Sequence, residues 1–302
     1  MSDPLSQVVE LLSPRAAFAN VVSGKGNWAV HYSEFGKPSF CVVLEGSCRL
    51  TVRGHAPLDI RAGDFVLLPT TPAFTLSSFI AAPPVHFDPD QVAGGTQELR
   101  YGEPTGSPDM RSLGGSFEFD SANSSLLVSL LPDVVHVRES ARLAQLVQLV
   151  GDEASGQMPG SELIRSRLIE LMLIEAMRAT TTGDAPPGLL RGLGDKRLAI
   201  ALKQMHANIA HAWTVEQLAA AASLSRSAFF ARFSRKLGMA PKAYLHAWRM
   251  EVAKERLRRR DMSVTEVAES VGYGSASAFS VAFARHVGLS PGRYSRGVEV
   301  TG

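Results

Sequence analysis

The sequence predicts an α+β protein, in which a β-rich N-terminal half precedes an all-α domain with two helix-turn-helix motifs. Two observations predict this class. From residue 17 to about residue 87, short apolar runs alternate with Gly and Pro, as in β-sandwiches and small barrels. Between residues 213 and 296, one helical pattern occurs twice.

Each copy of the repeat opens with the signature of a helix N-terminus. Thr214 precedes Gln217, and Ser263 precedes Glu266, so each pair can form a capping box. The copies are offset by 49 residues at the first helix and by 50 at the second. Matching residues include Ala219 and Ala268, Phe229 and Phe279, Phe233 and Phe283, Gly238 and Gly288, Pro241 and Pro291, and Tyr244 and Tyr294. This spacing favours two helix-turn-helix units over ordinary helical hairpins.

The repeat resembles the DNA-binding domain of the AraC/XylS family of bacterial transcription regulators. The matching residues are Trp213-Thr214-Val215, Leu218-Ala219, Ser225-Arg226-Ser227-Ala228-Phe229 and Tyr244-Leu245 in the first copy, and Val267-Ala268, Val271-Gly272-Tyr273, Phe279, Phe283, Gly288-Leu289-Ser290-Pro291 and Tyr294 in the second. One departure is Ser295, which separates Tyr294 from Arg296. The resemblance implies a transcription regulator that binds double-stranded promoter DNA, with RNA polymerase as a further partner.

Charge is distributed unevenly along the chain. From Arg191 to the end there are 18 Lys and Arg against 8 Asp and Glu, whereas the first 190 residues carry 13 against 21. A basic C-terminal part behind an acidic N-terminal part predicts that only the repeat meets a polyanion.

The outward positions of the two second helices are the candidate DNA contacts. Because the paired Phe residues point inward, Ser234 and Ala284 are also expected outside. The candidates are the helix N-termini at Thr214, Ser225, Ser263 and Ser275, then Arg226, Ser227, Phe230 and Ala231 in the first copy, and Ala276, Ser277, Ser280, Val281 and Arg285 in the second. We expect the first copy to read sequence through Arg226, and the second mainly to hold phosphates.

A long helix is predicted from Pro241 to Arg259 or Arg260, and it would join the two copies rigidly. Leu245, Trp248, Val252 and Leu257 are expected on one side of it. Its end carries Arg256, Arg258, Arg259 and Arg260. Such a run is usually a solvated face, and phosphate contact is the alternative.

In the N-terminal half we expect a short amphipathic helix at residues 5–12 and a strand at residues 28–32. Residues 39–44 and 47–52 are predicted to form a hairpin around Glu45-Gly46. Arg61-Ala62-Gly63-Asp64 is predicted as a turn before a strand at residues 65–69. Residues 83–123 are interpreted as loops that carry a few late strands, such as one at residues 125–131.

The segments Leu44-Glu45-Gly46 and Gly63-Asp64-Phe65-Val66-Leu67-Leu68-Pro69 resemble the two signature segments of cupin barrels, closest to the sensor domain of one branch of AraC-type regulators. The fold is thus predicted as a cupin-like β-barrel followed by the two helix-turn-helix motifs. The barrel is expected to enclose a pocket for a small-molecule effector, lined by Trp28, Val30, Cys41, Val43 and Phe74, unless it is packed shut.

Metal-binding cupins suggest an alternative, a cupin metalloenzyme fused to a nucleic-acid-binding tail. Here Cys41 and Phe74 stand where such cupins place ligands, and the 8 His residues are scattered without paired spacing. A metal site needs three or four converging ligands. We therefore expect no catalytic residues, no metal and no cofactor, and His31 and His55 are interpreted as surface or hydrogen-bonded residues.

The two cysteines have two interpretations. In the predicted hairpin, Cys41 and Cys48 would be diagonal neighbours with Cα atoms about 7–8 Å apart, whereas a disulfide usually needs about 4.4–6.8 Å. Buried structural thiols are the favoured interpretation, and a redox switch is the alternative. The small cysteine count, the lack of a signal sequence and the lack of an apolar run of membrane-spanning length predict a cytoplasmic protein with no membrane partner.

Two amphipathic helices follow the barrel. One has its apolar stripe at Leu143, Leu146, Val147 and Val150, and the other at Leu163, Ile164, Leu168, Leu171, Met172 and Glu175. They are expected either to cap the barrel or to pair with a second subunit in a homodimer, as in the resembling family. Residues 180–188 are predicted as a linker. The predicted domains are residues 1–135 for sensing, 136–185 for dimerisation and linkage, and 186–302 for DNA binding.

Overall fold

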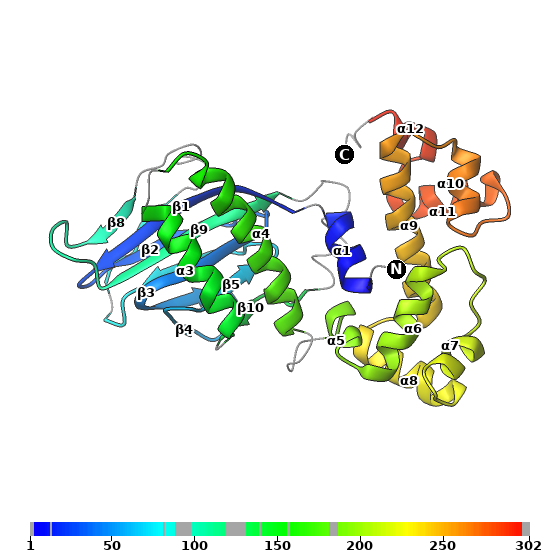
Figure 1. Ribbon diagram of the computed structural model, residues 1–302, viewed down its shortest axis with the longest axis horizontal. Helices are drawn as coiled ribbons and strands as arrows, with labels where there is room; N and C mark the ends of the chain where they lie inside the picture. Colours follow the sequence, from blue (N-terminus) through cyan, green and yellow to red (C-terminus); the bar gives the residue numbers. More distant parts are fainter. Residues whose placement is uncertain are drawn as a thin grey trace. The chain divides into compact units, whose positions relative to one another are not determined.

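A computed structural model describes residues 3–12, 14–80, 82–87, 98–118, 131–138, 140–155, 158–180 and 187–297 (Figure 1). The chain forms two compact units. A sheet unit extends over Pro14–Phe119 and Leu131–Thr180, and a helical unit contains the first helix together with the C-terminal part of the chain. The predicted α+β class is confirmed. The predicted linker residues 181–186 lie outside the described residues.

The sheet unit is built on one curled sheet. Its strands are β1 (Arg15–Lys25), β2 (Ala29–Tyr32), β3 (Ser39–Val52), β4 (Leu58–Arg61), β5 (Phe65–Leu68), β6 (Phe74–Ser77), β7 (Val85–Phe87), β8 (Leu99–Gly102), β9 (Met110–Glu118) and β10 (Val135–Val137). They are ordered β7-β2-β6-β3-β9-β1-β8, with β4 and β5 also on β3 and β10 on β5. Because β3 pairs β9 and β5 along its first half and β6 and β4 along its second half, this strand curls the sheet.

The predicted hairpin at Glu45-Gly46 is wrong, because β3 continues through both residues. The pairing of β3 with β9 shifts register between Val43 and Glu45. Gly46 has φ +69°, and a Cβ there would lie 1.9 Å from the carbonyl oxygen of Asp109. The glycine therefore marks a bulge and a close backbone approach rather than a turn.

The loop interpretation of residues 83–123 is also wrong in part. Strand β9 lies inside the sheet between β3 and β1, and β7 and β8 fall in the same stretch. Strand β9 was not predicted because Gly114, Gly115 and two serines are typical of turns, although here they lie in a largely buried strand. Of the predicted strand at residues 125–131, all but Leu131 lies outside the described residues.

Helices α3 (Ala141–Ser155) and α4 (Ser161–Thr180) pack on each other and on one face of the sheet (Figure 1). The predicted inward face of α3 is confirmed at Leu143, Val147 and Val150. The prediction for α4 is wrong in part, because Met172 is the only residue of its predicted stripe that is fully buried. The side chains that it buries are Ile169, Met172, Leu173, Ala176 and Met177.

The predicted stripe of α4 is thus left largely outside. Leu163 is 64% exposed, Ile164 is 46% exposed and Leu171 is 48% exposed. Apolar residues occur on every side of this helix, so their spacing does not single out the face that packs.

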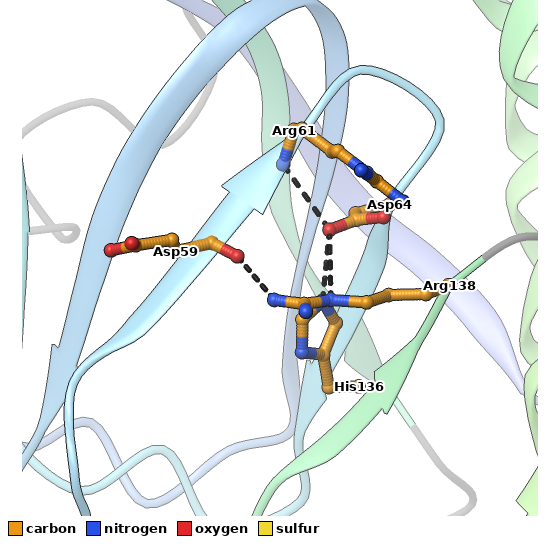
Figure 2. A network of polar contacts seen from close by, with 5 residues as sticks. All are labelled: Asp59, Arg61, Asp64, His136 and Arg138. Carbon is orange, nitrogen blue, oxygen red and sulfur yellow. Dashed lines mark hydrogen bonds and ion pairs between the residues drawn. The ribbon is translucent and has the colours of Figure 1, made fainter.

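A buried carboxylate fastens β10 to the turn before β5 (Figure 2). Asp64 lies 3.0 Å from Nε2 of His136 and 3.5 Å from Nε of Arg138, and it accepts a hydrogen bond of 3.2 Å from the backbone N–H of Arg61. Arg138 also donates to the carbonyl of Asp59. Since α3 begins shortly after β10, this network fixes the strand that leads into the helices. The turn predicted at residues 61–64 is confirmed.

The helical unit contains α1 (Pro4–Leu12), α5 (Leu189–Leu193), α6 (Lys196–Ala207), α7 (Val215–Ala221), α8 (Arg226–Leu237), α9 (Pro241–Arg259), α10 (Val264–Ser270), α11 (Ala276–Val287) and α12 (Pro291–Ser295). Helix α1 contacts α5, α6 and α9, and its residues Val8 and Leu12 are buried. The first helix of the chain is thereby part of the C-terminal core.

Each copy of the sequence repeat forms a head, the first built on α7 and α8 and the second on α10 and α11, and α9 runs between them (Figure 1). The predicted long helix is confirmed, with Pro241 in its first turn. Leu245, Trp248 and Leu257 are buried, as expected of the packed side of α9. No helix within the described ranges has the length and apolar character needed to cross a membrane.

Candidate nucleic-acid interface

Both predicted capping boxes are present. The hydroxyl of Thr214 accepts the backbone N–H of Gln217 at 3.2 Å, and the Gln217 side chain accepts the N–H of Thr214 at 2.9 Å. Ser263 and Glu266 repeat the exchange at 3.3 and 2.7 Å. These boxes fix where α7 and α10 begin, and thereby the entry into each head.

The second helices of the two heads, α8 and α11, are held by matching ends. Ser225 and Ser275 cap them, each accepting a backbone N–H three residues on, at 3.3 and 3.2 Å. Gly238 and Gly288 close them with φ near +80°. Phe229 and Phe233 in α8, and Phe279 and Phe283 in α11, are fully buried. The heads therefore present equivalent helices with equivalent outward faces.

Most of the predicted outward side chains of α8 are exposed. Arg226, Ser227 and Ala231 are exposed, and the ring of Phe230 is 47% exposed. The prediction for Ser234 is wrong, because its hydroxyl is buried and has no hydrogen-bond partner within the described part of the chain.

Arg226 has a partner that the sequence did not suggest. Its Nε lies 2.9 Å from Oε1 of Glu216 on α7, and both side chains are largely exposed. An exposed pair of this kind contributes at most about 1 kcal/mol, so DNA can compete for the guanidinium. The signal available in the sequence was only an acidic residue in the first turn of the preceding helix.

The outward face of α11 has less hydrogen-bonding capacity. Ser277 and Arg285 are exposed, and Val281 is 64% exposed. The hydroxyl of Ser280 instead donates to the carbonyl of Ala276 at 2.7 Å, within the same helix. Ala276 and Ala284 are half-buried.

The arginine run at the end of α9 is largely engaged within the protein. Arg258 and Arg259 both contact Glu255, and Nε of Arg260 donates to the carbonyl of Ser295 at 2.7 Å. Burial lowers the pKa of Arg256. These contacts tie the helix end to itself and to α12, which restricts the arginines as phosphate contacts.

Two buried carboxylates of the helical unit make ionic contacts between helices. Asp195 caps α6 and lies 2.7 Å from Nε of Arg232 on α8. Although burial acts to raise the pKa of Asp195, the Arg232 guanidinium and two backbone N–H groups outweigh it and lower that pKa. In α9, Lys254 lies 2.5 Å from buried Glu251, and His286 of α11 approaches the same carboxylate at 3.7 Å.

The sheet unit holds a cavity with about 80 Å³ of space for the centres of water-sized molecules. Of the predicted pocket residues, Cys41 and Phe74 line it, whereas Trp28, Val30 and Val43 lie in the packed core beside it. The side chains missed by sequence analysis include Asn20, Tyr32, Leu76, Phe87, Ser112 and Ser116. Most of them come from strands that sequence analysis did not place, so only the sheet topology brings them together.

Cys41 and Cys48 lie on the same strand, so their predicted placement as diagonal neighbours across a hairpin is wrong. Both thiols are free. Burial raises the pKa of Cys41 to about 12, and burial likewise raises that of Cys48. Since the thiolate is the reactive form, this direction favours the interpretation as buried structural thiols. Across the described residues, no group of three or more His, Cys, Asp or Glu could hold a metal ion.

Two family models match the chain. A model described as "Cupin" matches residues 3–182, and a model described as "Helix-turn-helix domain" matches residues 218–297. These matches define a class of transcription regulators in which a cupin-like domain precedes a DNA-binding domain.

Full-length relatives narrow this class. An AraC-like transcription regulator of Streptomyces antibioticus is 37% identical, with 97% of this chain and 98% of the relative covered. The RCS-specific activator RclR of Escherichia coli K12 is 28% identical, with 98% of each covered. The solved DNA-binding domain of AdpA in complex with a target DNA covers 34% of this chain and 93% of its own, at 34% identity and TM-score 0.33. The chain belongs to the AraC family of transcription regulators.

Proposed function

We propose that this chain is a sequence-specific DNA-binding regulator in which residues 186–302 bind promoter DNA. The observation that carries the proposal is the pair of matched heads on one continuous helix, α9, each with an exposed recognition helix. Helices α8 and α11 would enter successive major-groove segments, with the free N–H groups of their first turns toward phosphates. The proposed location is the cytoplasm, with RNA polymerase as a further partner.

The proposal is tested by gel shift of the full chain against its own promoter region and against a scrambled duplex of the same length. The expected result is tighter binding to the promoter, by about 1000-fold or more at physiological salt. Equal affinity for the two duplexes would exclude sequence-specific regulation and leave only general binding through the basic surface.

The two heads are proposed to have different roles in DNA binding, with the first head reading the base sequence. Arg226→Ala is expected to relax specificity at one or two base pairs beneath the first head, since a bidentate arginine contact discriminates by about 1–3 kcal/mol. The matched control is Ser277→Ala in the second head, which should leave the preferred sequence unaltered. Selection of binding sites from a random DNA pool measures both effects. A sequence preference lost in the Ser277 variant and kept in the Arg226 variant would reverse the assignment.

Control by a small molecule is proposed from the cavity in the sheet unit. It is concave, its lining is largely apolar and it includes a few polar groups, as is usual for small-molecule sites. Aromatic rings of Tyr32 and Phe74 stack there with centroids 4.6 Å apart. A ligand in this cavity would contact β1, β3 and β9 at once. It would therefore favour the curvature of the sheet that allows all three contacts.

A second copy of the chain is proposed to cover the outer face of α4. The intramolecular face of this helix is already occupied, whereas Leu163, Ile164 and Leu171 remain exposed. Leu163→Arg combined with Leu171→Arg is expected to convert a dimer into a monomer in sedimentation equilibrium. Ile200→Arg is the control, because Ile200 is 49% exposed on α6 of the helical unit. A monomeric wild-type protein, or a dimeric double variant, would contradict the proposal.

A further inference from the structure

The side chain of Asn20 lines the cavity of the sheet unit and has no hydrogen-bond partner among the described residues. Asn20 is only 6% exposed, and its backbone lies in β1 beside Gly114 of β9, whereas its side-chain amide makes no hydrogen bond within the described part of the chain. A buried amide left unpaired costs about 1–3 kcal/mol. Its donor and acceptor are therefore available to a molecule inside the cavity.

The residues of β9 beside Asn20 have small side chains, which leave space in the cavity. Asn20 and Cys41 both lie opposite Gly114, on the two strands that flank β9. Ser112, Gly114 and Ser116 alternate along β9, so they share one face of the sheet. A Cβ at Gly114 would meet only the carbonyl oxygen of Phe40, at 3.9 Å. The small side chains thus keep the cavity open beside Asn20.

The walls determine the chemistry of the occupant. Phe87 meets the edge of Tyr32 with ring centroids 5.2 Å apart, and Phe74 stacks on the same ring. Every described residue that lines the cavity is uncharged. An ionised ligand would lose its hydration there without a counter-charge, which is strongly unfavourable.

We propose that this cavity binds an uncharged, largely apolar molecule that carries a single hydrogen-bonding group. The group meets the amide of Asn20, and the apolar part packs against Tyr32, Phe74 and Phe87. The inference rests on the proposed small-molecule control of this regulator and names the chemical class of its effector.

A matched series of three probes tests the inference in the full-length protein by isothermal titration calorimetry. The probes are p-cresol, which is neutral with one hydroxyl, toluene, which lacks a hydrogen-bonding group, and p-toluate, which is charged. We expect p-cresol to bind at least about tenfold more tightly than either of the others. Tighter binding of p-toluate, or no binding of p-cresol, would overturn the assignment.

Two variants locate the site. Asn20→Leu is expected to weaken p-cresol binding about tenfold and to leave toluene binding unchanged, since only the hydrogen bond is lost. Gly114→Leu fills the cavity and is expected to abolish binding of p-cresol. Ser33→Ala, at the exposed rim, is the control. Unchanged p-cresol affinity in both Asn20→Leu and Gly114→Leu would place the ligand elsewhere.

Promoter binding is measured in parallel by gel shift without any probe. If the protein binds its promoter but none of the probes, the ligand assignment fails and DNA-binding regulation stands. If it binds p-cresol through Asn20 but shows no preference for its promoter, the regulator proposal fails and the assignment of ligand chemistry stands.

Discussion

Lowering the pH from 7.5 to 5.0 is expected to destabilise the helical unit by about 2 kcal/mol through His206. The His206 ring is buried between α6 and α9. It stacks on Trp248 with centroids 4.0 Å apart, and Nε2 lies 2.7 Å from the hydroxyl of Tyr244. Burial lowers the pKa of His206 from 6.5 to about 3. The folded state therefore disfavours the charged ring that acid favours in the unfolded chain.

The direction of the stability change with pH follows from the lowered pKa of His206. The stability associated with neutral His206 is fully present above pH 6.5, the unfolded value, and falls as the pH drops from there toward the folded pKa of about 3. His246 contributes in the same direction, because burial, His286 and Arg249 lower its pKa. The carboxylates Asp195 and Glu255, whose pKa values are also lowered, lose their contribution mainly at lower pH.

Hydrogen exchange of the amides in α6 and α9 measures the effect at both pH values, after correction for the intrinsic pH dependence of exchange. In His206→Gln most of the pH dependence should disappear, and the remainder is the share of His246. For each protein, the stability at pH 5.0 is compared with the stability of the same protein at pH 7.5. A lower overall stability of the variant therefore does not affect the comparison. The same loss between pH 7.5 and 5.0 in wild type and variant would exclude His206 as its source.

Phe233→Ala is expected to lower the free energy of unfolding by about 3–5 kcal/mol. It should also loosen the packing of α8, the recognition helix of the first head. Phe233 is fully buried, 5.5 Å from Phe229 and 5.8 Å from Tyr244 between ring centroids. Promoter affinity should fall by about 5- to 150-fold, because the proposed base contact of Arg226, about 1–3 kcal/mol, is lost. Scanning calorimetry and promoter gel shift measure the two effects.

The second head provides a matched comparison. Phe283 occupies the equivalent seat, and Phe283→Ala should cost similar stability. Since this head is proposed to hold phosphates, its loss should reduce the salt dependence of binding more than the sequence preference. Phe230→Ala, at an exposed position of α8, should change stability by less than about 0.5 kcal/mol. Wild-type melting and promoter affinity in Phe233→Ala would contradict the proposed seat.

Features that depend on residues close together in sequence were predicted correctly, whereas features that depend on contacts between distant residues were missed. The capping boxes at Thr214 and Ser263, and the αL ends at Gly238 and Gly288, follow from residues within one or two turns of each other. Such local signals predict both heads, including their buried phenylalanines. The partner of Arg226 was missed because Glu216 reaches it from the neighbouring helix through the fold.

The sheet unit was predicted less well for the same physical reason. Glu45-Gly46 satisfies the local rule for a turn, and only the pairing of β3 with β9 and the backbone of Asp109 shows that the glycine sits in a bulge. The glycines and serines of β9 border a cavity, and the other strands that line this cavity are distant from β9 in sequence. In α4, too many apolar residues obscured the packing face.

The placement of α1 determines how hybrid regulators can be assembled from this chain. A hybrid made by a single exchange near residue 185 would bring a foreign first helix to the surface formed by α5, α6 and α9, where Val8 and Leu12 are each 1% exposed. Grafting a different sensor in front of these heads therefore requires residues 3–12 to be retained with them. The transferable DNA-binding module of this protein is discontinuous in sequence, with its smallest piece on the N-terminal side of the sheet unit.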